Sequence, residues 1–209
     1  MQRKPPPSLY SHSVFINCPF DDEYRPIFWA VVFTVSACGY VPRCTLEHDD
    51  ASQVRIEKIY RLIEDSALSI HDVSRTELDS ENHLPRFNMP LELGVFLGSK
   101  RFGGKPHQAK RCLVLDRERY RFQKFISDIA GQDIKAHENK PRAAIRAVRD
   151  WLRRGVTGAL LPGGSHLCSA YESFTEELPG LCAPTKLAAA ELTFTDFRDL
   201  VGSWLASNK

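Results

Sequence analysis

The feature that most constrains the fold is an alternation of short β-rich runs with helical segments between residues 13 and 155. Alternation of this kind is typical of a parallel sheet with helices on both of its faces. We therefore expect an α/β protein with an open, five-stranded parallel sheet. The β-rich runs are SVFINC (13–18), YVPRCTL (40–46), ALSIHDVS (67–74), RCLVLD (111–116) and DIKAHE (133–138).

The segments between these runs carry helical signals. Residues 23–39 are largely apolar and end at Gly39, and Pro26 is tolerated in the first turn of such a helix. Pro42 lacks the amide that a central strand needs, so its run is expected at a sheet edge. The spacing of apolar residues predicts further helices at 49–66, from about Asn88 onward, at 119–131 and at 140–155.

The length of 209 residues fits one domain with an extension. We expect a flexible N-terminal arm (1–12), an α/β domain (13–155) and a C-terminal helical extension (156–209). Helical stretches are predicted around 166–178 and 195–206. The apolar residues of the second stretch, among them Phe197 and Trp204, predict docking on the main body or on a partner.

The composition argues against several classes of partner. The formal net charge is only +2, which gives no support for binding to nucleic acid. Arg142, Arg146, Arg149 and Arg153 form one stripe on their helix, which we interpret as a solvated face. No apolar stretch approaches the roughly 20 residues of a membrane span, and the N-terminus does not resemble a signal peptide. We expect a cytoplasmic protein whose six cysteines are buried free thiols.

Polar residues gather where the predicted strands end. In open parallel sheets, ligands bind beyond the carboxyl ends of the strands. Three segments reach that edge: NCPFDD after the first strand, DVSRTELD after the third, and the loop that leads to NMPLELG. Together they bring Asn17, Asp21, Asp72 and Asn88 to one rim, with Glu92 one turn into the following helix.

Glu92 is the acid in the apolar stretch RFNMPLELGVFLG, and it has two interpretations. It either decorates the first turn of a helix and faces solvent, or it is held in a pocket for chemistry. The helix dipole and one or two donors oppose the effect of burial, so we expect an ionised carboxylate, which suits a nucleophile. Asp72 likewise is either a turn former or the second acid of a pair. If they form a pair, the two carboxyl groups share one pocket.

Other chemistries lack the required patterns. GSKRFGGKP does not have the spacing of a phosphate loop and follows a helix instead of a strand. The histidines and cysteines show no metal-ligand spacing, and His71 is expected to be a packed residue. Cys18 lies at the rim, but nothing near it in the sequence would lower its pKa. We expect no metal and no cofactor.

At these residues the chain resembles the nucleoside 2-deoxyribosyltransferase-like superfamily, which includes nucleotide N-glycosidases and is akin to TIR-domain NAD hydrolases. The likeness spans roughly residues 13–136 and supports a flavodoxin- or Rossmann-like fold. It rests on four segments in the family's order, which are FINCPFDD, SIHDVS, PLELGVFLG and GGKPHQAKRCLVLD.

The resemblance implies a function at the rim. Glu92 would be the nucleophile that attacks the anomeric carbon of a ribosyl group, and Asp72 would lie in the base or sugar pocket. The substrate would be a nucleoside, a nucleotide or an NAD-like molecule, and the chain would be a hydrolase or transferase that forms homo-oligomers. A non-catalytic nucleotide-sensing module that signals through the C-terminal helices is the alternative. The expected substrate-binding residues are Asn17, Cys18, Pro19, Phe20, Asp21, Asn88 and Met89.

Overall fold

A computed structural model describes residues 7–47, 50, 52–78, 83, 87–155 and 160–208. Within these residues, five parallel strands form one open sheet in the order β2-β1-β3-β4-β5. The expected α/β class and open parallel sheet are confirmed, and the strand that contains Pro42 lies at an edge. The strands are β1 (Ser13–Asn17), β2 (Val41–Arg43), β3 (Leu68–Asp72), β4 (Arg111–Asp116) and β5 (Lys135–Ala136).

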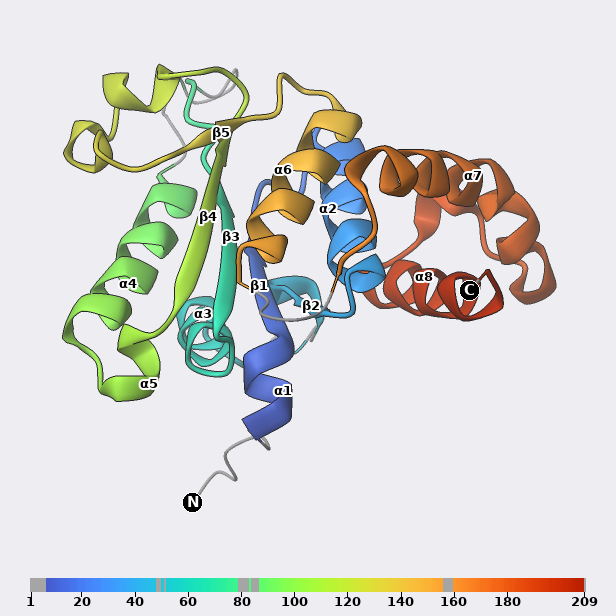
Figure 1. Cartoon of the computed structure of the whole chain (residues 1–209), viewed down its shortest axis with the longest axis horizontal. Coiled ribbons are helices and arrows are strands. Elements are labelled where there is room, and N and C mark those ends of the chain that lie inside the picture. Colours follow the sequence, from blue (N-terminus) through green and yellow to red (C-terminus); the bar gives the residue numbers. More distant parts are fainter. Residues whose placement is uncertain are drawn as a thin grey trace.

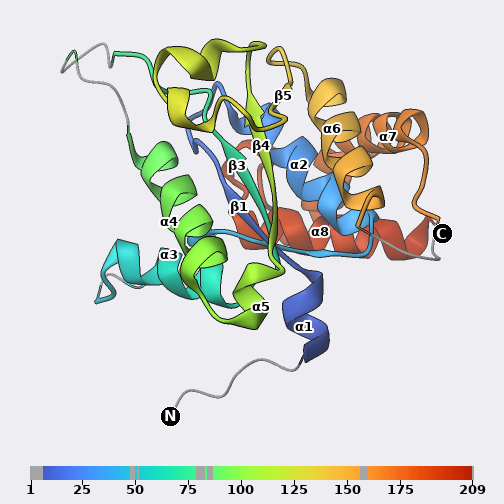
Figure 2. The same ribbon diagram turned by 60° about the vertical axis from the view of Figure 1, so that its left-hand side comes forward.

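Helices cover both faces of this sheet (Figures 1 and 2). On one face, α2 (Arg25–Ala37) and α6 (Pro141–Arg153) pack against each other. The other face is covered by α3 (Arg55–Glu64) and α4 (Asn88–Phe102), while the short α5 (Lys105–Gln108) follows α4.

The side chains of β1 show why both faces are covered. Val14 and Ile16 belong to the core cluster that includes α2 and α6, whereas Phe15 packs with Ile59 and Phe96 from α3 and α4. Successive side chains of a strand point to opposite faces, so an apolar strand such as β1 needs helices on both sides.

The C-terminal extension docks on the main body, as its apolar residues predict. Helices α7 (Gly164–Cys182) and α8 (Phe194–Ser207) pack on the outer side of α2 (Figure 1). The Trp29 ring of α2 stacks on Phe197 of α8, with ring centroids 4.0 Å apart. Phe33 contacts Phe174 of α7 at 5.5 Å. Thr193 and Asp196 form a capping box that fixes the start of α8.

Three expectations about local structure are wrong or need correction. Residues 7–12 of the expected flexible arm form helix α1 (Pro7–His12). Tyr10 anchors this helix to the main body: its carbonyl accepts a hydrogen bond from the Ala67 amide, and its hydroxyl donates to the Pro106 carbonyl. Residues 1–6 lie outside the described residues. Helix α4, expected from about Asn88 onward, continues to Phe102, and α5 follows it.

The expected helix at 119–131 is replaced by two short 3-10 turns, Arg121–Lys124 and Ser127–Ile129. The Arg121 side chain is buried and donates hydrogen bonds to Asp116 and to the Val73 carbonyl, which ties the first turn to the strand ends. The apolar side chains of this segment still reach the core.

The helix expected at 49–66 starts only at Arg55. The Asp50 carboxylate accepts hydrogen bonds from the Ser52 amide and the Gln53 side chain and so closes a turn ahead of the helix. Val54, which lies inside the expected helix, is therefore exposed just before the helix start.

The arginine stripe of α6 lies beside the C-terminal extension. Arg142 pairs with Glu172 of α7, and Arg149 donates hydrogen bonds to the carbonyls of Leu161 and Pro162. The stripe is therefore partly engaged by the chain itself. All six cysteines are free, and five of them are buried, while Cys112 is half-buried.

Candidate functional site

A cavity of about 280 Å³ lies at the carboxyl ends of the strands. The strand order reverses between β1 and β3, which is the point where open α/β sheets bind ligands. Six of the seven expected substrate-binding residues line this cavity, which we call the inner cavity. Its wall consists of Cys18, Pro19, Phe20, Asp21, Asn88 and Met89, together with Arg55 and Arg75.

The turn after β1 is held by hydrogen bonds of its own. The Asp21 carboxylate accepts from the Tyr24 amide at 2.9 Å and from the Arg75 guanidinium at 3.1 Å. Arg75 also pairs with Glu23 at 2.6 Å. The loop after β3 is thereby joined to the turn after β1. Asp21 is thus a structural residue of the wall as well as a candidate contact for a ligand.

Asn17, the seventh expected residue, lies behind the wall instead of in it. Its side-chain amide donates to the Met89 carbonyl at 3.3 Å and contacts Nδ1 of His71 at 3.0 Å. His71 is fully buried between β1 and α4, and burial lowers its pKa to about 3. The histidine is therefore a neutral packed residue, as the sequence predicts. Together with Asn17 it fixes the first turn of α4 against the sheet.

Glu92 is buried, with only 3% of its surface exposed. It follows Asn88 and Met89 by four and three residues on α4, so the three residues share one face of the helix. Side chains of a helix lean toward its N-terminus, which directs Glu92 toward the turn that lines the inner cavity. The interpretation of Glu92 as a solvent-facing decoration is therefore wrong.

Among the residues that the structure describes, none donates a hydrogen bond to the Glu92 carboxylate. Phe87 occupies the cap position of α4 without a side-chain hydrogen bond, so Asn88 is not the cap and Glu92 lies beyond the first turn. Burial raises the pKa of Glu92 to about 7, and the positive charge of Arg55 opposes this rise. The expectation of a fully ionised acid is corrected, because at this pKa the acid and the carboxylate are comparably populated at neutral pH.

Asp72 has the opposite surroundings. It is fully buried, and its Oδ1 accepts a hydrogen bond from the Ser74 amide at 2.8 Å. Its Oδ2 lies 3.1 Å from Nε2 of His137, which is also fully buried. Nδ1 of His137 accepts from the Asn139 amide, so Nε2 carries a proton and donates it to the Ser74 hydroxyl at 2.9 Å, while Oδ2 of Asp72 has no hydrogen-bond partner among the described residues.

The structure does not place the two acids in the wall of one cavity, contrary to the expectation of a shared pocket. Neither Glu92 nor Asp72 is part of the inner cavity wall. Cys18 is influenced by both acids. Burial is the main cause that raises the pKa of its thiol well above the usual value, and the negative charges of Asp72 and Glu92 add to this rise. Cys18 therefore stays protonated at the cavity wall. The part of Asp72 as a helper acid stays a prediction, and its observed contacts are those of a positioning residue.

Three residues of this region were missed by the sequence analysis. His137 follows β5 in a segment without any motif, and its partner Asp72 comes from a distant strand. Arg55 and Arg75 looked like ordinary surface charges, and only the fold brings them to the cavity. The one available signal was position, because Arg75 follows a predicted strand and His137 lies near the end of another.

Within the described part of the chain, no group of three or more histidine, cysteine or acidic residues is arranged to hold a metal ion. The helices of these same residues include none with the length and apolar character needed to cross a membrane. Comparisons with protein-family models, with curated proteins and with solved structures find no match to the chain.

Proposed function

We propose that the chain cleaves or transfers the N-glycosidic bond of a nucleoside, nucleotide or NAD-like molecule, with Glu92 as the nucleophile. One observation carries the proposal: a buried carboxylate without a hydrogen-bond donor among the described residues lies next to a cavity at the switch point of the sheet. Because nothing offsets its charge fully, this carboxylate favours a transition state in which positive charge develops.

The reaction would proceed in two steps. The bond between the anomeric carbon and the base nitrogen breaks, its electron pair leaves with the base, and positive charge spreads over the ring oxygen and the anomeric carbon. A Glu92 oxygen then bonds to that carbon, and the leaving base takes up a proton from solvent water. In the second step water or another base attacks the anomeric carbon and frees the carboxylate. Water makes the chain a hydrolase, and a second base makes it a transferase.

Of the two resting forms of Glu92, one is competent in this scheme. Only the carboxylate is a nucleophile, so at a pKa of about 7 roughly half of the molecules are competent at neutral pH. A substrate that carries positive charge on its base would lower this pKa further. Asp72 and His137 would act indirectly, since they hold the loop from which Arg75 reaches the inner cavity wall.

The alternative is a non-catalytic module that senses nucleotides. Helix α8 docks on α2 through aromatic contacts, and α2 begins just after the turn that lines the inner cavity. Such a connection could transmit ligand binding to the C-terminal helices.

A substrate panel separates the two functions. The protein would be incubated with nucleosides, nucleotides and NAD, and free base would be measured by chromatography. We expect base release by the wild type and none by Glu92→Gln, while Glu57→Gln, a change of an exposed glutamate on α3, leaves release unchanged. Binding without turnover would support the sensing module, and the absence of both would overturn both functions.

A further inference from the structure

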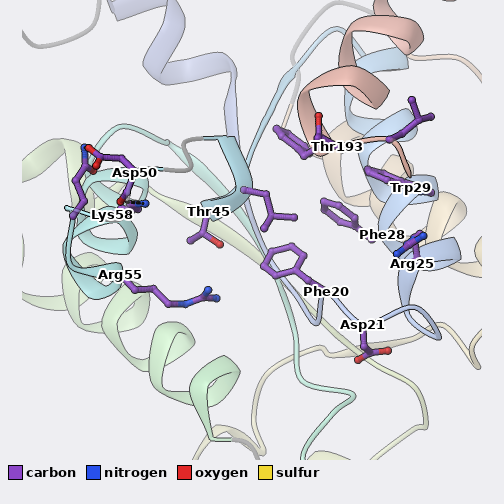
Figure 3. Close-up of a pocket in the computed structure, with 14 residues that line it drawn as sticks. Phe20, Asp21, Arg25, Phe28, Trp29, Thr45, Asp50, Arg55, Lys58 and Thr193 are labelled. Atoms are coloured by element: carbon purple, nitrogen blue, oxygen red, sulfur yellow. Dashed lines mark hydrogen bonds between the residues drawn. The ribbon is translucent and has the colours of Figure 1, made fainter. Parts of the chain in front are cut away.

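A second and larger cavity adjoins the inner one. It has a volume of about 560 Å³ and lies between α2, the turn at Thr45–Glu47, α3 and the start of α8 (Figure 3). We call it the outer cavity. Phe20, Asp21 and Arg55 line both cavities, so the two spaces meet at these three side chains.

The volumes indicate that a ligand of the inner cavity extends into the outer one. Small-molecule sites have volumes of about 300–1,000 Å³. The inner cavity, at about 280 Å³, falls just below that range, whereas the outer cavity lies within it. A nucleoside that fills the inner cavity would therefore direct any further substituent past Phe20 and Arg55.

The charges of the outer cavity favour an anion. Figure 3 shows Arg55 reaching from α3 toward Phe20. Among the described residues, the Arg55 guanidinium has no hydrogen-bond or ion-pair partner. Lys58 and Arg25 also line the cavity. Lys58 donates to the Asp50 carbonyl, whereas Arg25 donates to the Ala190 carbonyl and pairs with Asp22.

The two acids that line the outer cavity are already engaged. Asp50 accepts hydrogen bonds from Ser52 and Gln53, and Asp21 accepts from the Tyr24 amide and from Arg75. Both carboxylates therefore accept hydrogen bonds within local turns, while Arg55 extends toward the cavity with no hydrogen-bond or ion-pair partner among the described residues. The positive end of the α3 dipole lies at the same place and adds to the attraction for an anion.

Aromatic rings form the opposite wall. Phe20 meets Phe28 edge to face at 5.3 Å, and Phe28 lies 6.0 Å from Phe194 of the C-terminal extension. Thr193 and Phe194 bring the start of α8 into the wall. The extension thus helps to form the cavity, and a planar or apolar group could pack there beside an anion.

We infer that the outer cavity binds the phosphate group of a nucleotide whose ribosyl group occupies the inner cavity, so that phosphorylated nucleosides are preferred over nucleosides. The inference rests on the proposed function for the identity of the inner ligand. Arg55 is the main phosphate contact, because it is the cation shared by both cavities, and Lys58 adds to it.

The test is equilibrium binding to the full chain that carries Glu92→Gln, so that turnover plays no part. Adenosine, AMP, uridine and UMP would be titrated by calorimetry at low and high salt. We expect at least one nucleotide to bind about tenfold or more tightly than its nucleoside, and this advantage to shrink as salt rises. Arg55→Gln with Lys58→Gln should remove most of the advantage, whereas Lys140→Gln, at an exposed lysine paired with Glu138, should keep it.

The outcomes separate this inference from the proposed function. If nucleosides bind as tightly as nucleotides, if the double variant retains the advantage, or if no probe binds, the inference is overturned. The proposed function is judged independently by base release from the wild type. An enzyme that releases base from nucleosides and nucleotides with equal kcat/KM would keep its proposed function and lose this inference.

Discussion

Two buried acids lie near the carboxyl end of the same sheet, and their surroundings differ. Asp72 is held by a backbone amide and faces His137, while Glu92 has no donor among the described residues. Asp72 uses its Oδ1 to hold the loop after β3, although its Oδ2 has no hydrogen-bond partner among the described residues. Neither oxygen of Glu92 is committed to a described donor, so this acid is available for chemistry. The contrast teaches that burial alone does not identify a reactive acid. The hydrogen-bond partners of a buried acid determine whether it holds the structure or is available for chemistry.

The largest expected effect concerns catalysis. Glu92→Ala removes the proposed nucleophile and should lower the rate of base release by about 10³-fold or more. Added sodium formate should restore part of the rate, because a small carboxylate can enter the space left by the side chain. Chromatography of the products would measure both effects. A lack of rescue, with a variant that folds normally, would assign Glu92 a structural part.

The second prediction concerns stability at Asp72. Asp72→Asn replaces an acceptor that faces Nε2 of His137 with an amide donor, and it should lower the free energy of unfolding by about 3 kcal/mol. Urea denaturation followed by circular dichroism would measure the change. Asp133→Asn is the matched control, because that exposed aspartate pairs with Lys135 and should cost less than about 1 kcal/mol. Equal losses in the Asp72→Asn and Asp133→Asn variants would contradict the structural part assigned to Asp72.

The third prediction is a gain in the free energy of unfolding instead of a loss. The pKa of Glu92 is about 7 in the folded chain and near 4.5 when unperturbed. Ionisation therefore destabilises the fold, and stability is lost as pH rises from the lower value through the higher one. Glu92→Gln lacks this cost and should be more stable than the wild type by about 2 kcal/mol at pH 8. Near pH 4.5 the difference should approach zero, and a difference that is independent of pH would contradict the raised pKa.

The smallest effect concerns the charge next to Glu92. Arg55 lowers the pKa of this acid, so Arg55→Gln should raise it further. The rate of base release requires the carboxylate, and its rise with pH should therefore shift to higher pH, by less than about one pH unit. Profiles of kcat/KM against pH would show the shift. A shift to lower pH would contradict the assigned influence of Arg55.

Much of the fold could be predicted because its signals are local. Apolar runs such as SVFINC and the periodic helix at 140–155 predicted the order of the elements and the parallel sheet. The segment 119–131 has helical spacing of its apolar residues, yet the buried contacts of Arg121 favour two 3-10 turns. Those contacts join segments that are distant along the chain, and no local pattern encodes them.

The site was predictable in position but not in its electrostatics. The rule for open parallel sheets placed the residues after β1 and before α4 at one rim, and six of them line one cavity. The pairing of Asp72 with His137 depends on β5 lying beside β4, and the approach of Arg55 depends on where α3 starts. The protonation of Glu92 was misjudged because the absence of donors around a side chain cannot be read from its neighbours in the sequence.

The central claim is that Glu92 is a desolvated acid beside a cavity, and its titration tests this most directly. With ¹³C-labelled glutamate, the side-chain carboxyl signal of Glu92 would be followed by NMR from pH 4 to pH 9 and assigned by its loss in Glu92→Gln. The account predicts a midpoint near pH 7, well above the midpoints of exposed glutamates such as Glu57. A midpoint near 4.5 would show a solvated carboxylate and would contradict the account.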